Sequence, residues 1–181
     1  MNFNLEKISE KLTHGNAELL HSHNFSNGRK FPKSYIDFVE NFGYGLSCNL
    51  FIIYIPMESY PDSFFIRSKE IIGTYQDVLD NENELWFDME PDLSYKKLRD
   101  LIPFAMSENG HYLFWDIESE SSEEFDIYIT DFKGLGFTKA GRNLYDFFEK
   151  ITSKNKFKEV LPFSENSLPN IFKPISILKL P

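Results

Sequence analysis

The residues of this chain that come nearest to an acid–base site in type and spacing are His111, Asp116 and Asp126. A histidine that relays protons needs a carboxylate within hydrogen-bond reach. All three residues lie on two stretches that we predict to be neighbouring strands, and side chains alternate between the two faces of a strand. His111 and Asp116 are five positions apart and therefore point to opposite faces, which argues against a catalytic dyad.

No other pattern in the sequence indicates catalysis or a bound metal. The chain has no glycine-rich phosphate loop, no HExxH motif and no GxSxG motif. The segment Asp116-Ile-Glu118-Ser-Glu120 alternates carboxylates but lacks the central glycine and the closing glutamate of an EF-hand loop. Cys48 is the only cysteine, so an internal disulfide and a cysteine-rich zinc site are excluded, and we expect a buried thiol. We therefore predict no enzyme activity, no metal and no cofactor.

Acidic side chains gather instead at two places. The stretch from Leu101 to Phe132 predicts a hairpin whose strands, His111–Ile117 and Phe125–Phe132, are rich in aromatic and β-branched residues. The loop between them and a run from Asp77 to Asp92 without Lys or Arg supply our candidate partner-binding residues. These are Glu118, Glu120, Glu123, Glu124 and Asp126 in the hairpin, and Glu82, Glu84, Trp86, Asp88, Glu90 and Asp92 in the run. The alternative, that the acids are solvated surface charges and Trp86 is a core ring, stays open.

The charge balance limits the possible partners. The net charge of −9 argues against binding of nucleic acid, which needs Lys and Arg to neutralise phosphates. No apolar run approaches the ~20 residues that cross a bilayer, and the first residues lack a signal-peptide pattern. We expect a cytoplasmic protein with a basic protein partner. The sequence gives no signal for an oligomeric state.

Short periodic stretches predict the elements that would position these residues. Leu5, Ile8 and Leu12 predict a helix over 4–12, which a polar loop follows over 13–30. Further elements are a helix that starts at Pro32 and ends before Gly43, a strand over 46–56, a short strand over 64–67, a helix over 68–79 capped by Ser68, and a helix over 143–151. Residues 153–181 predict an extension packed on the domain through Phe157, Leu161, Phe163 and Ile171.

Three motifs, in this order, resemble a known family. Phe31-Pro-Lys-Ser-Tyr-Ile-Asp-Phe-Val-Glu-Asn-Phe-Gly-Tyr-Gly45 is similar to the helix-to-strand signature of the SMI1/KNR4 (SUKH) superfamily. Leu101-Ile-Pro-Phe-Ala105 with Glu108-Asn-Gly110 and Leu113-Phe-Trp-Asp116 resembles its central strand pair, and 143–151 resembles its closing helix. His111 stands where an aspartate often follows the glycine, and Gly-Tyr-Gly replaces Asn-Gly-Gly.

The resemblance covers residues 1–152 and implies a fold and a function. It implies an α+β domain with an antiparallel, at most mixed, sheet flanked by helices. Many bacterial members are immunity proteins that neutralise a cognate polymorphic toxin, often a nuclease, by binding it. Fungal relatives act as regulatory scaffolds, and this alternative remains open at the level of sequence.

Overall fold

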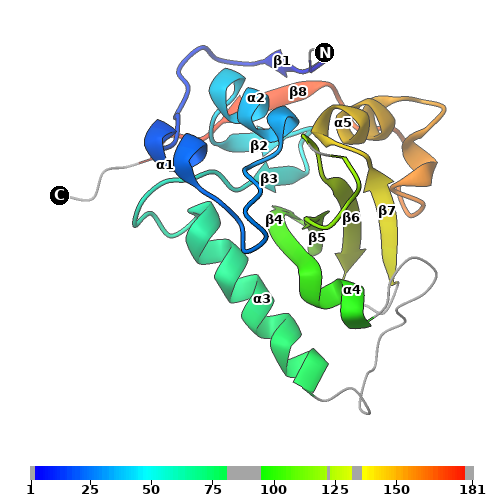
Figure 1. The fold of residues 1–181 in the computed structure, drawn as a ribbon. Helices are drawn as coiled ribbons and strands as arrows, with labels where there is room; N and C mark the ends of the chain where they lie inside the picture. The colour runs from blue at the N-terminus through cyan, green and yellow to red at the C-terminus, as the bar shows by residue number, and fades with distance from the viewer. Residues whose placement is uncertain (1–2, 81–94, 122, 132–135, 178–181) are drawn as a thin grey trace.

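The computed structural model of the chain describes residues 3–80, 95–121, 123–131 and 136–177 (Figure 1). Within these ranges one mixed sheet of eight strands has the order β1-β8-β2-β3-β4-β5-β6-β7. The strands are β1 (Glu6–Lys7), β2 (Gly45–Ser47), β3 (Phe51–Ile53), β4 (Leu101–Ser107), β5 (His111–Asp116), β6 (Asp126–Asp131), β7 (Phe137–Gly141) and β8 (Ile171–Pro174). All neighbours are antiparallel except β1 and β8. The α+β class predicted from the sequence is confirmed, in its mixed form.

The helices of the described residues are α1 (Ala17–Ser22), α2 (Lys33–Asn41), α3 (Phe64–Asp80), α4 (Tyr95–Asp100) and α5 (Leu144–Thr152). Figure 1 shows α2 and α5 together over the sheet, while α3 runs away from the body of the domain. The Phe38 ring of α2 stacks on Phe148 of α5 at 5.6 Å between ring centroids. Phe147 of α5 meets Phe51 of β3 edge to face at 5.3 Å, which fixes this helix layer on the sheet.

An aromatic core joins α2 and α3 to strands β4 and β5. Trp115 of β5 is buried and lies flat on Phe104 of β4, with 4.1 Å between ring centroids. Tyr35 of α2 and Phe64 of α3 meet the same indole at 4.9 and 5.8 Å. Edge-to-face and offset ring pairs of this kind add to the free energy gained by burial. Trp115 thus ties β5 to β4, α2 and α3.

Two elements predicted from the sequence are confirmed with close boundaries. The expected helix after Pro32 is α2, whose Tyr35 and Phe38 are buried. The expected helix over 143–151 is α5, and the side chain of Asn143 caps it by accepting a hydrogen bond from Asp146 N–H. The predicted hairpin is β5–β6.

The helix predicted over 4–12 is wrong. Residues 6 and 7 form β1, in which Glu6 N–H donates to Asn170 O at 2.8 Å, and Ile8 N–H donates to Phe172 O. Ile8, part of the apparent apolar stripe, is 58% exposed. A three-residue stripe is too weak a helix signal to compete with hydrogen bonds offered by a neighbouring strand.

The single strand predicted over 46–56 is also wrong, because it folds back as β2 and β3. Cys48 and Asn49 make the turn with φ of 56° and 57°, a left-handed conformation that the sequence does not mark with glycine. The strand predicted over 64–67 is the first turn of α3, and Ser68 is therefore a buried residue inside the helix, not its cap.

The segment after residue 152 contributes to the sheet itself. Its strand β8 lies between β1 and β2, with Phe172 opposite Ser47. Leu161 and Phe172 are fully buried, and Phe157 is nearly so. Phe163 stacks on the His111 ring at 4.4 Å between centroids but remains 45% exposed.

Candidate functional site

The end of the β5–β6 hairpin brings two carboxylates together. Asp116 and Asp126 lie directly opposite each other in the register and share one face of the sheet. Each carboxylate has a lysine partner: Lys97 Nζ lies 3.1 Å from Asp116 Oδ2, and Lys139 Nζ lies 2.6 Å from Asp126 Oδ2. Two like charges at neighbouring positions are thereby neutralised separately.

Besides its ion pair with Asp116, Lys97 contacts Tyr128. Its Nζ donates a 2.6 Å hydrogen bond to the hydroxyl of Tyr128 and lies 4.5 Å from the centre of that ring. Burial alone would lower the pKa of Lys97, but the bonds to Tyr128 and Asp116 and the charge of Asp116 outweigh it and raise the pKa. Lys97 therefore stays a cation.

His111 does not join these carboxylates. It lies opposite Asp131 at the other end of β5. Its Nδ1 lies 2.9 Å from Asn109 Oδ1 and 3.3 Å from Ser107 Oγ, and Ser107 Oγ accepts the His111 backbone N–H at 2.7 Å. These hydrogen bonds hold the β4–β5 turn. Because Ser107 is fully buried, its hydroxyl is not accessible as a nucleophile.

The loop after β5 is wrapped around the guanidinium of Arg29. The Arg29 group donates to four backbone carbonyls: Ile117 O at 2.7 Å, Ser119 O at 2.9 Å, Glu124 O at 3.0 Å, and Ser121 O. It also lies 4.2 Å from the centre of the buried Phe125 ring. We call residues 117–121 and 123–124, fixed in this way, the clamped loop.

One residue before α2, Asn27, and one in the first turn of α2, Ser34, complete the clamp. Asn27 Nδ2 donates to Ile117 O and to Glu118 Oε1, both at 2.9 Å. The carboxylate of Glu124 accepts from Ser34 N–H at 3.0 Å and from Ser34 Oγ at 2.6 Å. Burial raises the pKa of Glu124, although the two bonds from Ser34 act in the opposite direction. Glu124 therefore anchors the loop to the N-terminus of α2.

The acidic residues nominated from the sequence consequently have different roles. Glu118, Glu120 and Glu123 are exposed, whereas Glu124 is half-buried in the clamp and Asp126 is bound to Lys139. Glu82, Glu84, Trp86, Asp88, Glu90 and Asp92 lie in 81–94, outside the described residues.

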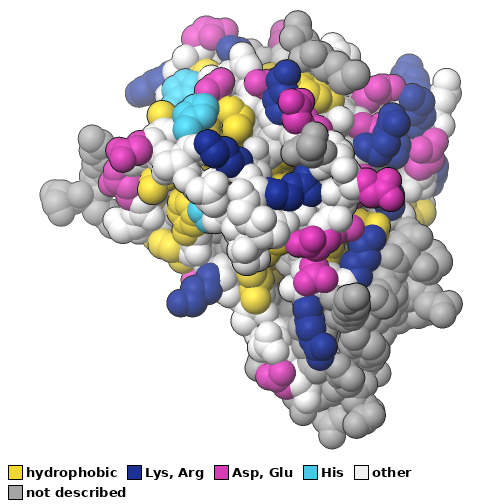
Figure 2. Space-filling view, viewed as in Figure 1, with side chains coloured by type: hydrophobic (Ala, Val, Ile, Leu, Met, Phe, Trp, Pro, Cys, Tyr) yellow, Lys and Arg dark blue, Asp and Glu magenta, His cyan; other side chains and the backbone are white. Residues whose placement is uncertain are grey.

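The surface around the clamped loop carries both signs of charge. A hollow of about 800 Å³ beside it is lined by Lys97, Lys139 and Arg142 as well as by the hairpin carboxylates. Acidic and basic side chains are interleaved over the face seen in Figure 2. Lys97, Lys139 and Arg142 come from segments distant in the sequence from the loop. The surface around the loop is therefore less acidic than the loop sequence alone indicates.

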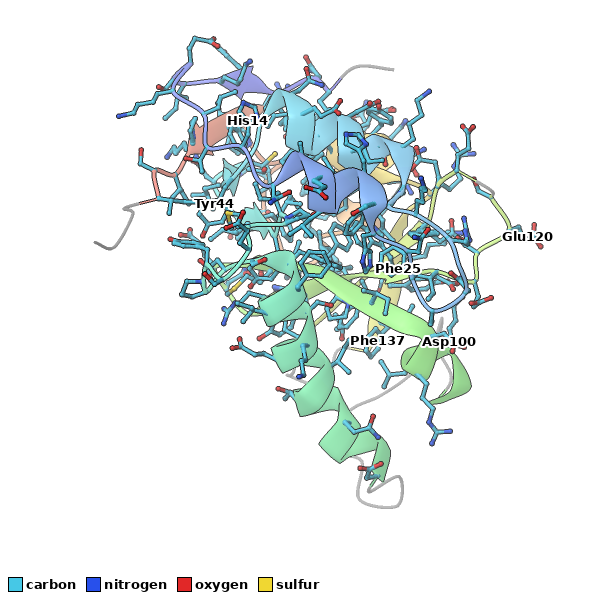
Figure 3. All side chains as sticks on the ribbon, turned by 60° about the vertical axis from the view of Figure 1, so that its left-hand side comes forward. His14, Phe25, Tyr44, Asp100, Glu120 and Phe137 are labelled. Atoms are coloured by element: carbon cyan, nitrogen blue, oxygen red, sulfur yellow. The ribbon has the colours of Figure 1, made fainter. Side chains whose placement is uncertain are left out.

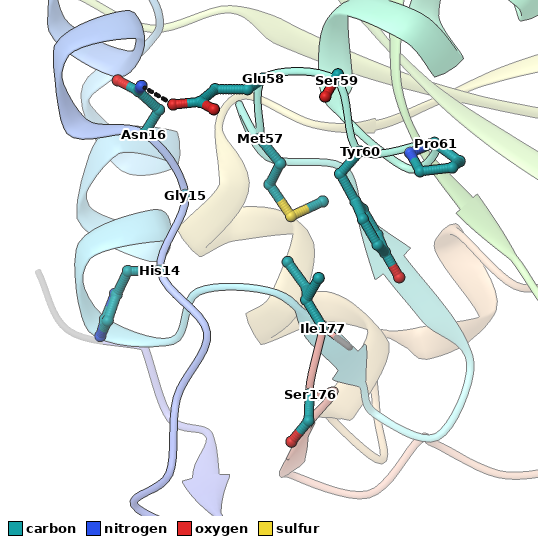
Figure 4. Close-up of a pocket in the computed structure, with 10 residues that line it drawn as sticks. All are labelled: His14, Gly15, Asn16, Met57, Glu58, Ser59, Tyr60, Pro61, Ser176 and Ile177. Carbon is teal, nitrogen blue, oxygen red and sulfur yellow. Dashed lines mark hydrogen bonds between the residues drawn. The ribbon is translucent and has the colours of Figure 1, made fainter. Parts of the chain in front are cut away.

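A second hollow of about 880 Å³ lies between residues 14–16, 57–61 and 176–177 (Figure 4). We call it the apolar groove. The side chains of Met57, Tyr60 and Ile177 converge in it, while His14 points away. At its rim Asn16 Nδ2 donates to Glu58 Oε1 at 3.0 Å.

Sequence reasoning missed Arg29, Asn27 and Ser34 as determinants of the loop. The only local signal was Asn27-Gly28, a turn dipeptide in which Gly28 has a φ of 81°. The stretch over 13–30 that we predicted as loop also contains α1, which Asn16 caps by accepting Leu19 N–H.

Two further findings concern only the described part of the chain. It contains no group of three or more His, Cys, Asp or Glu side chains placed to hold a metal ion. Among its helices, none combines the length and the apolar character that a membrane crossing requires.

The chain matches a known protein family. A family model described as "SMI1-KNR4 cell-wall" matches residues 19–148. The match begins within α1 and ends within α5, and it includes the clamped loop, Arg29 and the paired aspartates. No curated protein and no solved structure shows significant similarity to the chain.

Proposed function

The chain belongs to the SMI1/KNR4 (SUKH) family, and from that premise we propose that it is a non-catalytic binding protein of the immunity type, neutralising a cognate bacterial toxin in the cytoplasm. The observation that carries the proposal is the clamped loop. Three exposed carboxylates, Glu118, Glu120 and Glu123, stand on a backbone fixed by Arg29. A preformed loop loses little conformational entropy when it binds, so more of its contact energy becomes affinity.

The chemistry of a nuclease toxin fits this surface. Such an enzyme needs Lys and Arg to hold phosphates, so an inhibitor that covers the groove benefits from carboxylates. The net charge of −9 would also draw the two proteins together and raise the association rate. We propose Glu118, Glu120 and Glu123 as direct contacts, whereas Glu124 and Asp126 act through the shape of the loop.

The alternative is a regulatory or scaffolding module without a toxin partner. It is favoured by the description of the matching family model, which refers to the cell wall. The two functions differ in the partner that they require, so a partner search separates them.

The decisive experiment is affinity purification from a lysate of the organism that carries the gene, at low and high salt, with mass spectrometry of the bound proteins. We expect a multidomain protein with a basic C-terminal domain, released by salt. The double variant E120K/E123K should lose this protein, and the matched variant E159K/E165K, also exposed, should retain it. Recovery of a cell-wall enzyme or a kinase instead would favour the scaffolding function.

A further inference from the structure

Three large side chains, those of Met57, Tyr60 and Ile177, line the apolar groove. Met57 is buried, Tyr60 and Ile177 are partly exposed, and all three converge on the same space (Figure 4). Methionine is unbranched and adapts its shape to what it contacts. The groove is open to solvent, and an extended chain segment needs to bury only one side.

Two loops pack closely at one wall of the groove, with residues 15 and 16 against Pro56. Asn16 N–H donates to Pro56 O at 2.7 Å, and a Cβ at position 15 would lie 2.2 Å from the same oxygen. Only glycine therefore fits at position 15. The backbone on this side of the groove is therefore held by close packing of residues 15 and 16 on Pro56.

Glu58 gives the rim of the groove its charge. Its backbone is left-handed, with φ of 47°, a conformation that glycine would adopt without strain. One carboxylate oxygen accepts from Asn16, and within the described residues Glu58 has no other hydrogen-bond partner. Among the described residues, those that line the groove include this carboxylate and no Lys or Arg. A basic side chain would therefore complement the charge of Glu58 at the rim.

We propose that the apolar groove binds an extended segment of a protein partner that carries one large apolar side chain next to a lysine or arginine. The apolar side chain fills the space between Met57, Tyr60 and Ile177. The basic side chain pairs with the free oxygen of Glu58.

This site is separate from the clamped loop. Figure 3 places His14, which lines the groove, at one side of the molecule and Glu120 at the opposite side. A partner held in the groove thus leaves the clamped loop accessible. The inference does not depend on the proposed toxin binding, and the two can be tested on the same protein.

The test is to select a displayed library of random linear peptides on the full-length chain. We expect enriched peptides to contain an aromatic or aliphatic residue beside Lys or Arg. The variant I177D should weaken a selected peptide about tenfold or more, because an apolar contact is replaced by a buried charge. E58Q retains an acceptor for Asn16 and removes only the charge, so we expect a loss of about two- to fivefold.

Matched variants on other surfaces are the controls. I8D alters an apolar side chain that is exposed elsewhere, and E120K alters the clamped loop; both should bind the selected peptides as the parent does. In E58K, the preference should switch to peptides with Asp or Glu in place of the basic residue. If no peptide is enriched, or if enriched peptides bind I177D and E58K unchanged, the proposal is overturned. E120K should impair toxin binding only, so failure of one proposal is distinguishable from failure of the other.

Discussion

Replacing Arg29 by alanine should destabilise the whole domain, because this one side chain organises the clamped loop. Three of its hydrogen bonds, to Ile117 O, Ser119 O and Glu124 O, are partly buried. Each is worth about 1 kcal/mol net after discounting for solvent. The cation over Phe125 adds about 0.5–1 kcal/mol. Since neighbouring contacts are not additive and water replaces some of them, we expect a total loss of about 3 kcal/mol.

Urea unfolding followed by tryptophan fluorescence measures this loss, since Trp115 lies in the core beside Phe125. With a slope of about 2 kcal/mol per molar urea, the midpoint of R29A should fall by about 1.5 M. R29K keeps the positive charge near Phe125 but cannot span several carbonyls, so it should lose about half as much.

The control is R142A, whose side chain is 80% exposed and paired with Asp146 at 3.8 Å. Such a surface pair is worth under about 0.5 kcal/mol. If R29A lowers the midpoint by less than about 0.5 M, or if R29K behaves as R29A does, Arg29 is not the clamp that its contacts indicate. Hydrogen exchange of the amides of the clamped loop should accelerate in R29A more than in R142A.

Three further predictions concern single positions. Gly15→Ala should cost about 2 kcal/mol or more in thermal unfolding, because its Cβ would meet Pro56 O, whereas Gly73→Ala, with open space in the α3 helix, should stabilise by about 0.5–1 kcal/mol. Burial raises the pKa of Glu124, so its contribution to stability is present below its ordinary pKa of 4.5 and is lost as pH rises through the folded value. Between about pH 4 and 7, the urea midpoint of the parent protein should therefore fall relative to that of E124Q. If the two midpoints change with pH in the same way, this prediction is contradicted. Burial raises the pKa of the Cys48 thiol to about 12, so a thiol reagent at pH 8 should label the chain in urea but not the native protein.

The parts of the fold that sequence predicts well are those with local signals. The helix after Pro32 and the helix after Asn143 each combine an apolar stripe with a recognisable start. The β4–β5 turn carries Asn109-Gly110, in which Gly110 has a φ of 91°. Each of these features is decided by residues close together in the chain, so periodicity and turn chemistry are sufficient.

The parts that sequence misses depend on distant partners. Glu6 pairs with Ile171, and nothing near either residue indicates a parallel strand pair. The β2–β3 turn uses Cys48 and Asn49 in left-handed conformations, which tertiary contacts stabilise without a glycine. The same is true of the candidate site: the acidic loop is visible in the sequence, but Arg29 lies about 90 positions before the carbonyls that it binds.

The way in which the loop is held bears on how binding specificity can change in such a protein. Arg29 bonds to backbone carbonyls, and a backbone carbonyl is present whatever the side chain. Glu120 and Glu123 can therefore be exchanged for other residues without loosening the clamp. Glu124 cannot, because its carboxylate itself anchors the loop to Ser34. A scaffold that fixes the backbone and leaves exposed side chains unconstrained allows recognition to vary while the fold stays constant.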